Sequence, residues 1–310
     1  MSPDSKSAKP KGFIPTKRDV EIVLAVADRR ALTTPQIDAL FFPTKGESRV
    51  TGVSSRCQAR LKVLAENDYI ESREQPTLLT EGRKPRIHLL STKGAKVYQD
   101  ETGKKADWSK QENDVTPRRL EHLIQTNWLR IYFELSARAH GWSIEEWLDD
   151  RTLKRMQPEM AVEVKMEGQK PLKTAVTPDG YFRLVVPTEE GRERVYHMFV
   201  ECDLGNTTGV SSVWGRRDYR HKILAYNAFV HSGKYEALFE AKTMRVMTVT
   251  TSEERVDYLK KLTEEAGGKA RFWFTSFDRF DHVLTFSDPL VDTIWQVASK
   301  LGYYSPTEAP

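Results

Sequence analysis

The sequence predicts an α+β protein of two domains. Its 310 residues are enough for two modest domains, and 39% hydrophobic residues allow each domain a core. Residues 16–101 contain short helical patterns followed by two strand-like segments, whereas residues 116–300 open with a long helical pattern before strands and helices alternate. No run of eighteen apolar residues occurs in the sequence, so we expect a cytoplasmic protein without a membrane partner.

Three shorter segments are expected to lie outside these domains. Residues 1–15 are rich in Lys, Pro and Ser and predict a disordered basic arm, residues 102–115 read as a polar linker, and residues 301–310 form a tail. The two cysteines, Cys57 and Cys202, each sit in an apolar segment. We therefore expect buried, reduced thiols and neither a disulfide framework nor a thiolate metal site.

Charge is distributed unevenly between the two halves. Residues 1–110 hold 21 Lys and Arg against 14 Asp and Glu, a balance of +7, so the remaining residues carry −3 of the total of +4. A basic module joined to a mildly acidic one indicates that the first part meets a polyanion, although ordinary surface charge gives the same count.

The first domain begins with three predicted helices. The first covers residues 17–28, behind Thr16 as N-cap, and the second starts at Thr33-Thr34-Pro35. Ser54 or Ser55 caps the third helix, in which apolar residues at helical spacing face inward and polar ones face outward.

Two strand-like segments follow, residues 69–73 and 86–90, with a basic loop before the second and another helix after Ser91. Three helices and a hairpin make a winged helix-turn-helix, and its third helix would read double-stranded DNA. A protein-docking role for this domain is the alternative. The candidate DNA-binding residues lie on the third helix and the loop: Ser54, Ser55, Arg56, Gln58, Arg60, Arg83, Lys84 and Arg86.

The second domain starts with a helix at residues 118–140. Strand candidates follow at 142–148, 161–166, 179–187 and 195–204, then a helix at 214–231, a strand at 245–250, a helix at 252–266 and a strand at 271–276. The core order is αβββαβ.

Three carboxylates stand out in this domain. Asp179 precedes one strand, within Pro178-Asp179-Gly180, and Glu201 and Asp203 end the next. Because alternate strand residues share a face, the three can converge on one cation. Alternatively, Asp179 is simply a turn residue, since Pro-Asp-Gly is a common turn former.

The αβββαβ order and the two acidic signatures resemble the PD-(D/E)xK nuclease superfamily. The resemblance implies a Mg²⁺-dependent (or Mn²⁺-dependent) DNA endonuclease in which Asp179 and Glu201 bind the metal. Asp203 stands where that pattern has its lysine. Either Lys222 on the following helix replaces the lysine, or Asp203 is a third metal ligand, or the site has lost cleavage.

A longer series of short motifs, in order over residues 17–297, resembles the replication-relaxation family. The residues that carry it are His122, Leu123, Asn127, Arg130, Pro178, Asp179, Gly180, Val200, Glu201, Asp203, Gly205, Lys222, Tyr226, Val249, Thr250, Ile294 and Trp295.

This resemblance implies a bacterial protein of plasmids and mobile elements, associated with the nucleoid or a plasmid. Two functions are compatible with it: a metal-dependent endonuclease or nickase in plasmid replication, relaxation or mobilisation, and a non-catalytic accessory factor whose second domain mediates dimerisation or docking. The partners implied are double-stranded DNA, a second copy of the chain, and other replication or transfer proteins.

Overall fold

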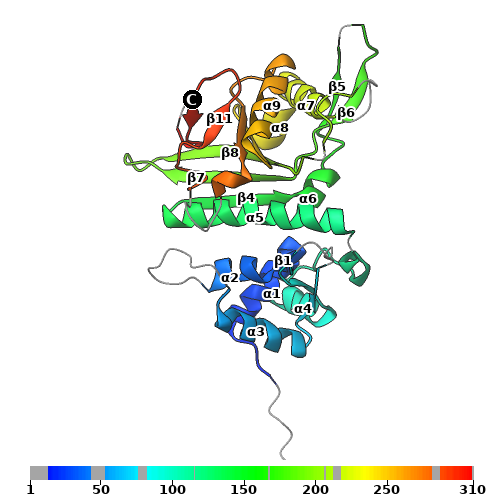
Figure 1. Ribbon diagram of the computed structural model, residues 1–310, viewed down its shortest axis with the longest axis vertical. Coiled ribbons are helices and arrows are strands. Elements are labelled where there is room, and N and C mark those ends of the chain that lie inside the picture. Colours follow the sequence, from blue (N-terminus) through cyan, green and yellow to red (C-terminus); the bar gives the residue numbers. More distant parts are fainter. Residues whose placement is uncertain are drawn as a thin grey trace, which may run out of the picture. The chain divides into compact units, whose positions relative to one another are not determined.

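The computed structural model describes residues 13–42, 53–75, 82–114, 116–166, 168–205, 207–211, 218–280 and 287–308. Over these residues the chain is a mixed α+β protein, as predicted, and it forms two compact units, Met1–Asn127 and Trp128–Pro310 (Figure 1). The boundary falls within α5 (Pro117–Ala139). Most of the predicted basic arm, residues 1–12, and residues 214–217, the first part of the helix predicted at 214–231, lie outside the described residues.

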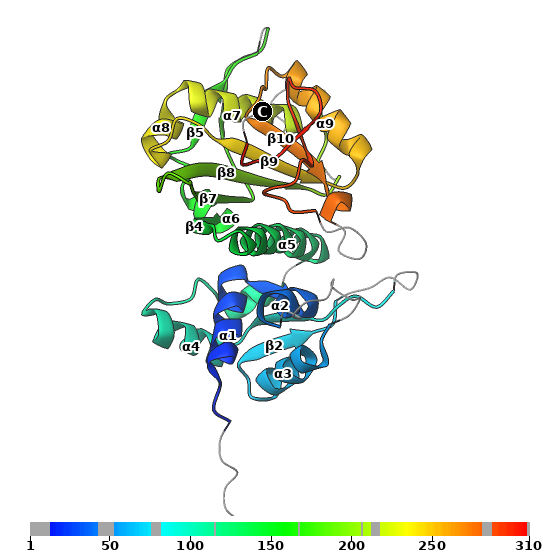
Figure 2. The same cartoon turned by 90° about the vertical axis from the view of Figure 1, so that its left-hand side faces the viewer.

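The first unit is built from short helices around a three-stranded antiparallel sheet of order β1-β3-β2. Its elements are α1 (Lys17–Arg29), β1 (Ala31–Thr33), α2 (Thr34–Phe41), α3 (Ser55–Glu66), β2 (Ile70–Arg73), β3 (Ile87–Leu90), α4 (Thr92–Thr102) and the 3-10 helix η1 (Lys110–Asn113). Figure 2 shows α3 beside β2.

The predicted helix starts are confirmed by their caps. Thr16 and Thr33 each form a reciprocal capping box, with Asp19 and Gln36, and the Ser54 side chain accepts a hydrogen bond from the Cys57 amide. Thr33 also ends β1, a three-residue strand that the sequence does not predict.

The segment expected to be a linker packs on the first unit. Asn113 is buried in η1, and its side-chain amide donates to the Leu90 carbonyl and to Glu71. Its own carbonyl oxygen accepts from Arg73, so residues 110–113 are tied to the β2–β3 hairpin.

The second unit holds a seven-stranded mixed sheet of order β12-β11-β10-β9-β8-β7-β4. After α5 its elements are β4 (Ser143–Asp149), α6 (Asp150–Arg155), β5 (Ala161–Val164), β6 (Leu172–Ala175), β7 (Gly180–Pro187), β8 (Glu193–Asp203), α7 (Tyr219–His231), α8 (Lys234–Phe239), β9 (Arg245–Thr250), α9 (Glu253–Glu265), β10 (Phe272–Ser276), the 3-10 helix η2 (Phe277–Phe280), β11 (Trp295–Val297) and β12 (Tyr303–Tyr304).

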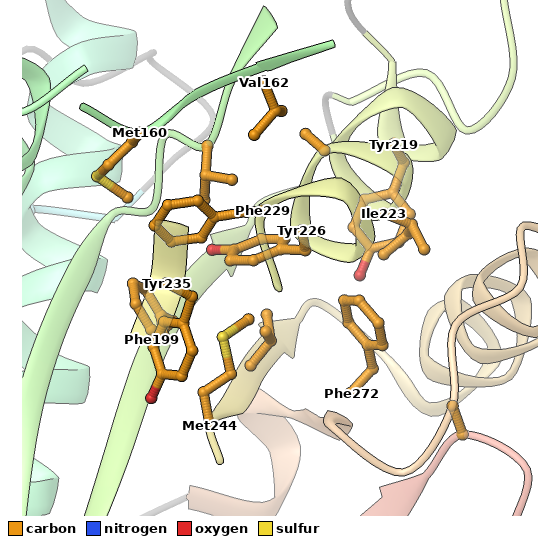
Figure 3. Close-up of a cluster of buried hydrophobic side chains, with 14 of the residues drawn as sticks. Met160, Val162, Phe199, Tyr219, Ile223, Tyr226, Phe229, Tyr235, Met244 and Phe272 are labelled. Atoms are coloured by element: carbon orange, nitrogen blue, oxygen red, sulfur yellow. The ribbon is translucent and has the colours of Figure 1, made fainter. Parts of the chain in front are cut away.

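Helices cover both faces of this sheet. Apolar residues of α5, among them Leu129 and Phe133, pack with Phe182, Val200 and Cys202 on one face. The other face carries α7, α8 and α9, and Figure 3 shows a cluster there of side chains from α7, β8 and β10. Strands β8, β9 and β10 are parallel, so their carboxyl ends lie at the same edge of the sheet.

Two segments differ from the expectation. The strand at 161–164 does not join the large sheet, because it pairs antiparallel with β6 in a separate two-stranded sheet that projects from the unit (Figure 1). Residues 303–304, within the predicted tail, pair with β11 and extend the large sheet. Among the described residues no helix is long and apolar enough to cross a membrane.

Candidate functional site

The acidic residues of β8 lie on the face of the sheet that α7, α8 and α9 cover. Phe199 belongs to the cluster under α7, whereas Val200 and Cys202 belong to the cluster under α5. Since side chains alternate along a strand, Glu201 and Asp203 share the face of Phe199, as the sequence predicts. Both are buried, with 1% and 5% of their surface exposed.

Asp179 lies directly across from Glu201. Gly180 pairs with Val200, so the register places Asp179 opposite Glu201, and the Asp179 amide donates to the Val200 carbonyl at 3.0 Å. The Asp179 carboxylate accepts from the Cys202 amide at 2.8 Å. Asp179 is therefore held by β8 through long-range contacts rather than by a local turn.

Lys222 and Tyr226 complete this group from α7. The Lys222 ammonium donates to Glu201 Oε2 at 2.5 Å, and the Tyr226 hydroxyl donates to Oε1 at 2.7 Å. The two side chains are four residues apart and therefore share one helix face. The structure thus brings three of the predicted residues together: Asp179, Glu201 and Lys222.

Burial and charge shift the pKa values of this group. Burial raises the pKa of Glu201, and the nearby Asp179 charge adds to the rise, while Lys222 opposes it. Burial lowers the pKa of Lys222, but the Glu201 and Asp179 carboxylates outweigh it and hold that pKa above its usual value. The lysine is therefore a cation next to two carboxyl groups.

Asp203 has a different set of partners. Its Oδ2 accepts from Thr250 Oγ1 at 2.8 Å and from Arg255 Nε at 2.9 Å, and its Oδ1 accepts from Arg255 Nη2 at 3.3 Å. Over the described ranges no group of three or more His, Cys, Asp or Glu side chains is placed to hold a metal ion. Of the three predicted metal ligands, Asp179 and Glu201 lie across from each other on neighbouring strands, whereas Asp203 is bound by Arg255 and Thr250.

Two carboxylates are a suitable donor set for Mg²⁺. This ion binds hard oxygen ligands and commonly takes one or two protein carboxylates, with water and substrate phosphate filling the other positions. A metal ion binds the ionised carboxylates, so a bound cation would lower the Glu201 pKa that burial raises.

A second candidate site lies in the first unit, where a hollow of about 1780 Å³ opens between α3, the β2–β3 hairpin and the start of α4. Basic side chains outnumber acidic ones along its lining. The basic ones are Lys62, Arg83, Lys84, Arg86, Lys93, Lys96 and Lys110, and the acidic ones are Glu66, Asp68 and Glu71. An excess of positive charge over a concave surface favours a polyanion.

The predicted DNA-binding residues fall into three groups: those that line the hollow, those bound to structural partners, and one that is exposed outside the hollow. Ser55, Gln58, Arg83, Lys84 and Arg86 line the hollow. Two others have structural partners: Ser54 caps α3, and the Arg60 guanidinium forms a two-point hydrogen-bonded ion pair with Asp19, which is fully buried in α1. Arg56 is exposed on α3, outside the lining.

Several residues of these sites are missing from the sequence prediction. Tyr226 is named there only as a residue of the family motif and could have been given a role at the site, because its i,i+4 spacing from Lys222 places it on the same helix face. Arg255 could not, since it reaches Asp203 across 52 residues of sequence. Lys93, Lys96 and Lys110 belong to elements that carry no recognition pattern.

Comparison with known proteins identifies the family of the chain. The family model described as replication-relaxation matches residues 24–241, which confirms the resemblance seen in the motifs. No curated protein and no solved structure matches the chain.

Proposed function

Because the chain belongs to the replication-relaxation family, which suggests a role in plasmid replication, we propose that it binds plasmid or mobile-element DNA and cuts it. In this proposal the first unit is a winged helix-turn-helix that holds double-stranded DNA. The second unit is a PD-(D/E)xK-like nuclease domain that nicks or cleaves the DNA with Mg²⁺ or Mn²⁺.

The observation that carries the nuclease proposal is the position of Lys222. The sequence has Asp203 where the nuclease pattern has lysine, and Lys222 supplies an ammonium 2.5 Å from Glu201 Oε2 instead. A carboxylate pair with an adjacent lysine has the composition of a phosphodiester-cleaving site. The element order from α5 through β4, β7, β8 and α7 to β9 also agrees with the αβββαβ core.

Each residue of the group has a distinct role in this proposal. Asp179 and Glu201 would hold the metal ion, which polarises the scissile phosphate and lowers the pKa of a bound water. Lys222 stabilises negative charge that develops on the phosphate. Tyr226 holds the Glu201 carboxylate by its hydrogen bond to Oε1, so that Glu201 keeps one orientation.

The DNA-binding proposal rests on the first unit. The order α1-β1-α2-α3-β2-β3-α4, with the sheet order β1-β3-β2, agrees with a winged helix. The basic hollow lies between its third helix and its hairpin, where phosphates of a bound duplex would be contacted.

The nuclease proposal is tested by incubating supercoiled plasmid DNA with the protein and Mg²⁺ or Mn²⁺. We expect nicked or linear products from the wild type, and their loss in Asp179→Asn, Glu201→Gln and Lys222→Met. Glu253→Gln is the matched control, because Glu253 is also a carboxylate held by an arginine but lies on α9 with different partners. Wild-type protein that leaves the plasmid intact with either metal refutes the nuclease proposal.

DNA binding is tested separately through its salt dependence. We expect the triple variant Lys62→Ala, Arg86→Ala, Lys96→Ala to reduce the slope of log K against log salt by about 2 to 3, at about 0.9 per lost phosphate contact. The control triple variant Lys17→Ala, Lys104→Ala, Lys105→Ala removes the same charge outside the hollow. Equal slopes for the two triple variants would show that the hollow does not contact DNA.

One observation favours a non-catalytic accessory role as a second candidate. Both oxygens of Glu201 already have protein partners, Lys222 and Tyr226, so the pair can also serve only to fix α7 on the sheet. DNA binding that is lost in the Lys62, Arg86 and Lys96 variant, together with an intact plasmid under all metal conditions, would identify this role.

A further inference from the structure

We propose that Asp203 and Arg255 act together as a positioning pair, which fixes residues 207–211 between β8 and α7 (called the loop below) and thereby places Lys222 beside Glu201. The expected effect of this pair on the cleavage rate rests on the proposed nuclease function. Its expected effect on the hydrogen exchange of the loop does not.

Arg255 connects the end of β8 to the loop that follows it. Its guanidinium donates twice to Asp203, and its Nη2 also donates to the Thr207 carbonyl at 2.7 Å. Thr250, at the end of β9, donates to the same Asp203 carboxylate. Asp203 thus holds an arginine from α9, and the arginine holds the loop.

The loop approaches α9 closely at a second point. A Cβ atom at Gly209 would lie 1.9 Å from the Tyr258 hydroxyl oxygen and 2.7 Å from the ring carbon that carries it, so only glycine fits here without displacement. The Arg255 guanidinium also lies over the Tyr258 ring, 5.3 Å from its centroid. Arg255 and Tyr258 are both on α9, and they contact adjacent parts of the loop.

The same loop completes the amino-terminal end of α7. The Thr208 carbonyl accepts from the Tyr219 amide at 3.0 Å, and the Gly209 carbonyl accepts from the Arg220 amide at 3.1 Å. These are the first two amides of the helix, which have no partner within it. Asp218 caps the third amide, of His221, and also accepts from the Ser211 amide.

Lys222 is the fourth residue of α7 and follows this end directly. A shift of residues 207–211 therefore moves the turn that carries Lys222. Because a displacement of about 1 Å at a catalytic group can cost about 100-fold in rate, the Asp203–Arg255 pair can act on catalysis without touching substrate.

The geometry distinguishes this role from two others for the same residues. A third metal ligand would share partners with the Asp179–Glu201 pair, yet the hydrogen-bond partners of Asp203 are Arg255 of α9 and Thr250 of β9, whereas those of Glu201 are Lys222 and Tyr226 of α7. A phosphate contact would present its guanidinium to solvent, yet the Arg255 side chain is 19% exposed and its hydrogen bonds point to Asp203 and Thr207.

The kinetic experiment uses the full-length variants Asp203→Ala, Arg255→Ala, Arg255→Lys and the Asp203→Ala, Arg255→Ala double variant on plasmid DNA. We expect kcat to fall about 10- to 100-fold in each alanine variant, with KM, DNA affinity and the metal half-saturation concentration unchanged. The double variant should be no slower than either single variant, because the two residues act as one unit. Arg255→Lys retains one hydrogen bond, so its kcat should lie between those of the wild type and Arg255→Ala.

Arg279→Ala is the matched control. It removes an arginine that also pairs with a carboxylate through two hydrogen bonds, to Glu253, and whose further hydrogen bond goes to Tyr303 rather than to residues 207–211. A rise in the metal half-saturation concentration of Asp203→Ala would make Asp203 a ligand instead, and a weaker affinity and smaller salt slope for Arg255→Ala would make Arg255 a phosphate contact. Either result overturns the inference.

Hydrogen exchange measured by mass spectrometry tests the loop without any cleavage. Peptides covering residues 207–222 should exchange roughly tenfold faster in Arg255→Ala, while Arg279→Ala leaves them unchanged. If the wild type does not cleave DNA but this exchange rises, the nuclease proposal fails and the loop contacts stand. If exchange is unchanged, the positioning pair is refuted whether or not the wild type cleaves.

Discussion

Replacing Lys222 with methionine is expected to destabilise the second unit in a pH-dependent way. Glu201 is 1% exposed, and Lys222, the cation beside it, has a side chain that is 31% exposed. Removing one member of a buried ion pair costs about 3 to 5 kcal/mol, because the other charge stays desolvated. Since solvent reaches part of Lys222, we expect a smaller cost than this, about 2 to 3 kcal/mol at pH 8.

The sign of the pH dependence follows from the Glu201 pKa. Burial already raises this pKa above its usual 4.5, and Lys222 opposes the rise. Removing Lys222 therefore raises the Glu201 pKa further. When the pKa of a carboxyl group is higher in the folded protein than in the unfolded one, the protein loses stability as pH rises from the unfolded-state pKa through the folded-state pKa. The deficit of Lys222→Met should therefore be small near pH 4.5 and grow toward pH 8.

Urea unfolding at pH 5 and pH 8, followed by tryptophan fluorescence, measures this deficit. Of the seven tryptophans, Trp108 is the one that precedes residue 128, so the signal reports mainly on the second unit. The double variant Glu201→Gln, Lys222→Met removes both charges and should show the same deficit at both pH values. The reasoning is refuted if Lys222→Met alone shows equal deficits at pH 5 and pH 8.

Three further predictions concern the first unit, each measured by urea or thermal unfolding. Arg60→Ala should destabilise it by about 2 to 3 kcal/mol, because the buried Asp19 carboxylate loses its cationic partner. Burial lowers the pKa of His88 to about 4. The wild type should therefore lose up to about 3 kcal/mol as pH falls from 6.5 to 4, and His88→Gln should flatten this loss. Gly94→Ala should cost about 1 to 3 kcal/mol, because its Cβ would lie 2.3 Å from a backbone carbonyl oxygen, whereas Gly82→Ala, with nothing within 4 Å, should be nearly neutral.

Local signals in the sequence predict the parts of the fold that depend on neighbouring residues. The caps at Thr16 and Ser54 act within three residues, so a short pattern is enough to find them. The same holds for β9, predicted at 245–250 and found at Arg245–Thr250, since its run of apolar and β-branched residues specifies a buried strand.

Long-range pairing is what sequence patterns miss. The strand β1 has three residues and exists because it pairs with β3, more than fifty residues later. The role of Arg60 depends on Asp19 in the same way, since an arginine on the polar side of a helix gives no local sign that it is bound to a buried carboxylate.

The candidate site contains both a feature that local sequence signals predict and a feature that depends on long-range packing. The alternation along β8 predicts that Glu201 and Asp203 share a face, and this is confirmed. Alternation does not predict that their partners differ, because Lys222 and Arg255 come from two helices whose packing is fixed by the core between them.

The placement of the two cysteines gives each unit its own chemical reporter. Cys57 is fully buried in the first unit, where burial raises its thiol pKa to about 12, and Cys202 is 6% exposed in the second unit, between the two acidic residues of β8 but on the opposite face. Thiol reagents attack the thiolate of an accessible cysteine, so each side chain would be labelled only when its own unit opens. Labelling rates at the two positions would therefore time the unfolding of the two units separately in the unmodified protein, and the rate at Cys202 would report on the strand that carries Glu201.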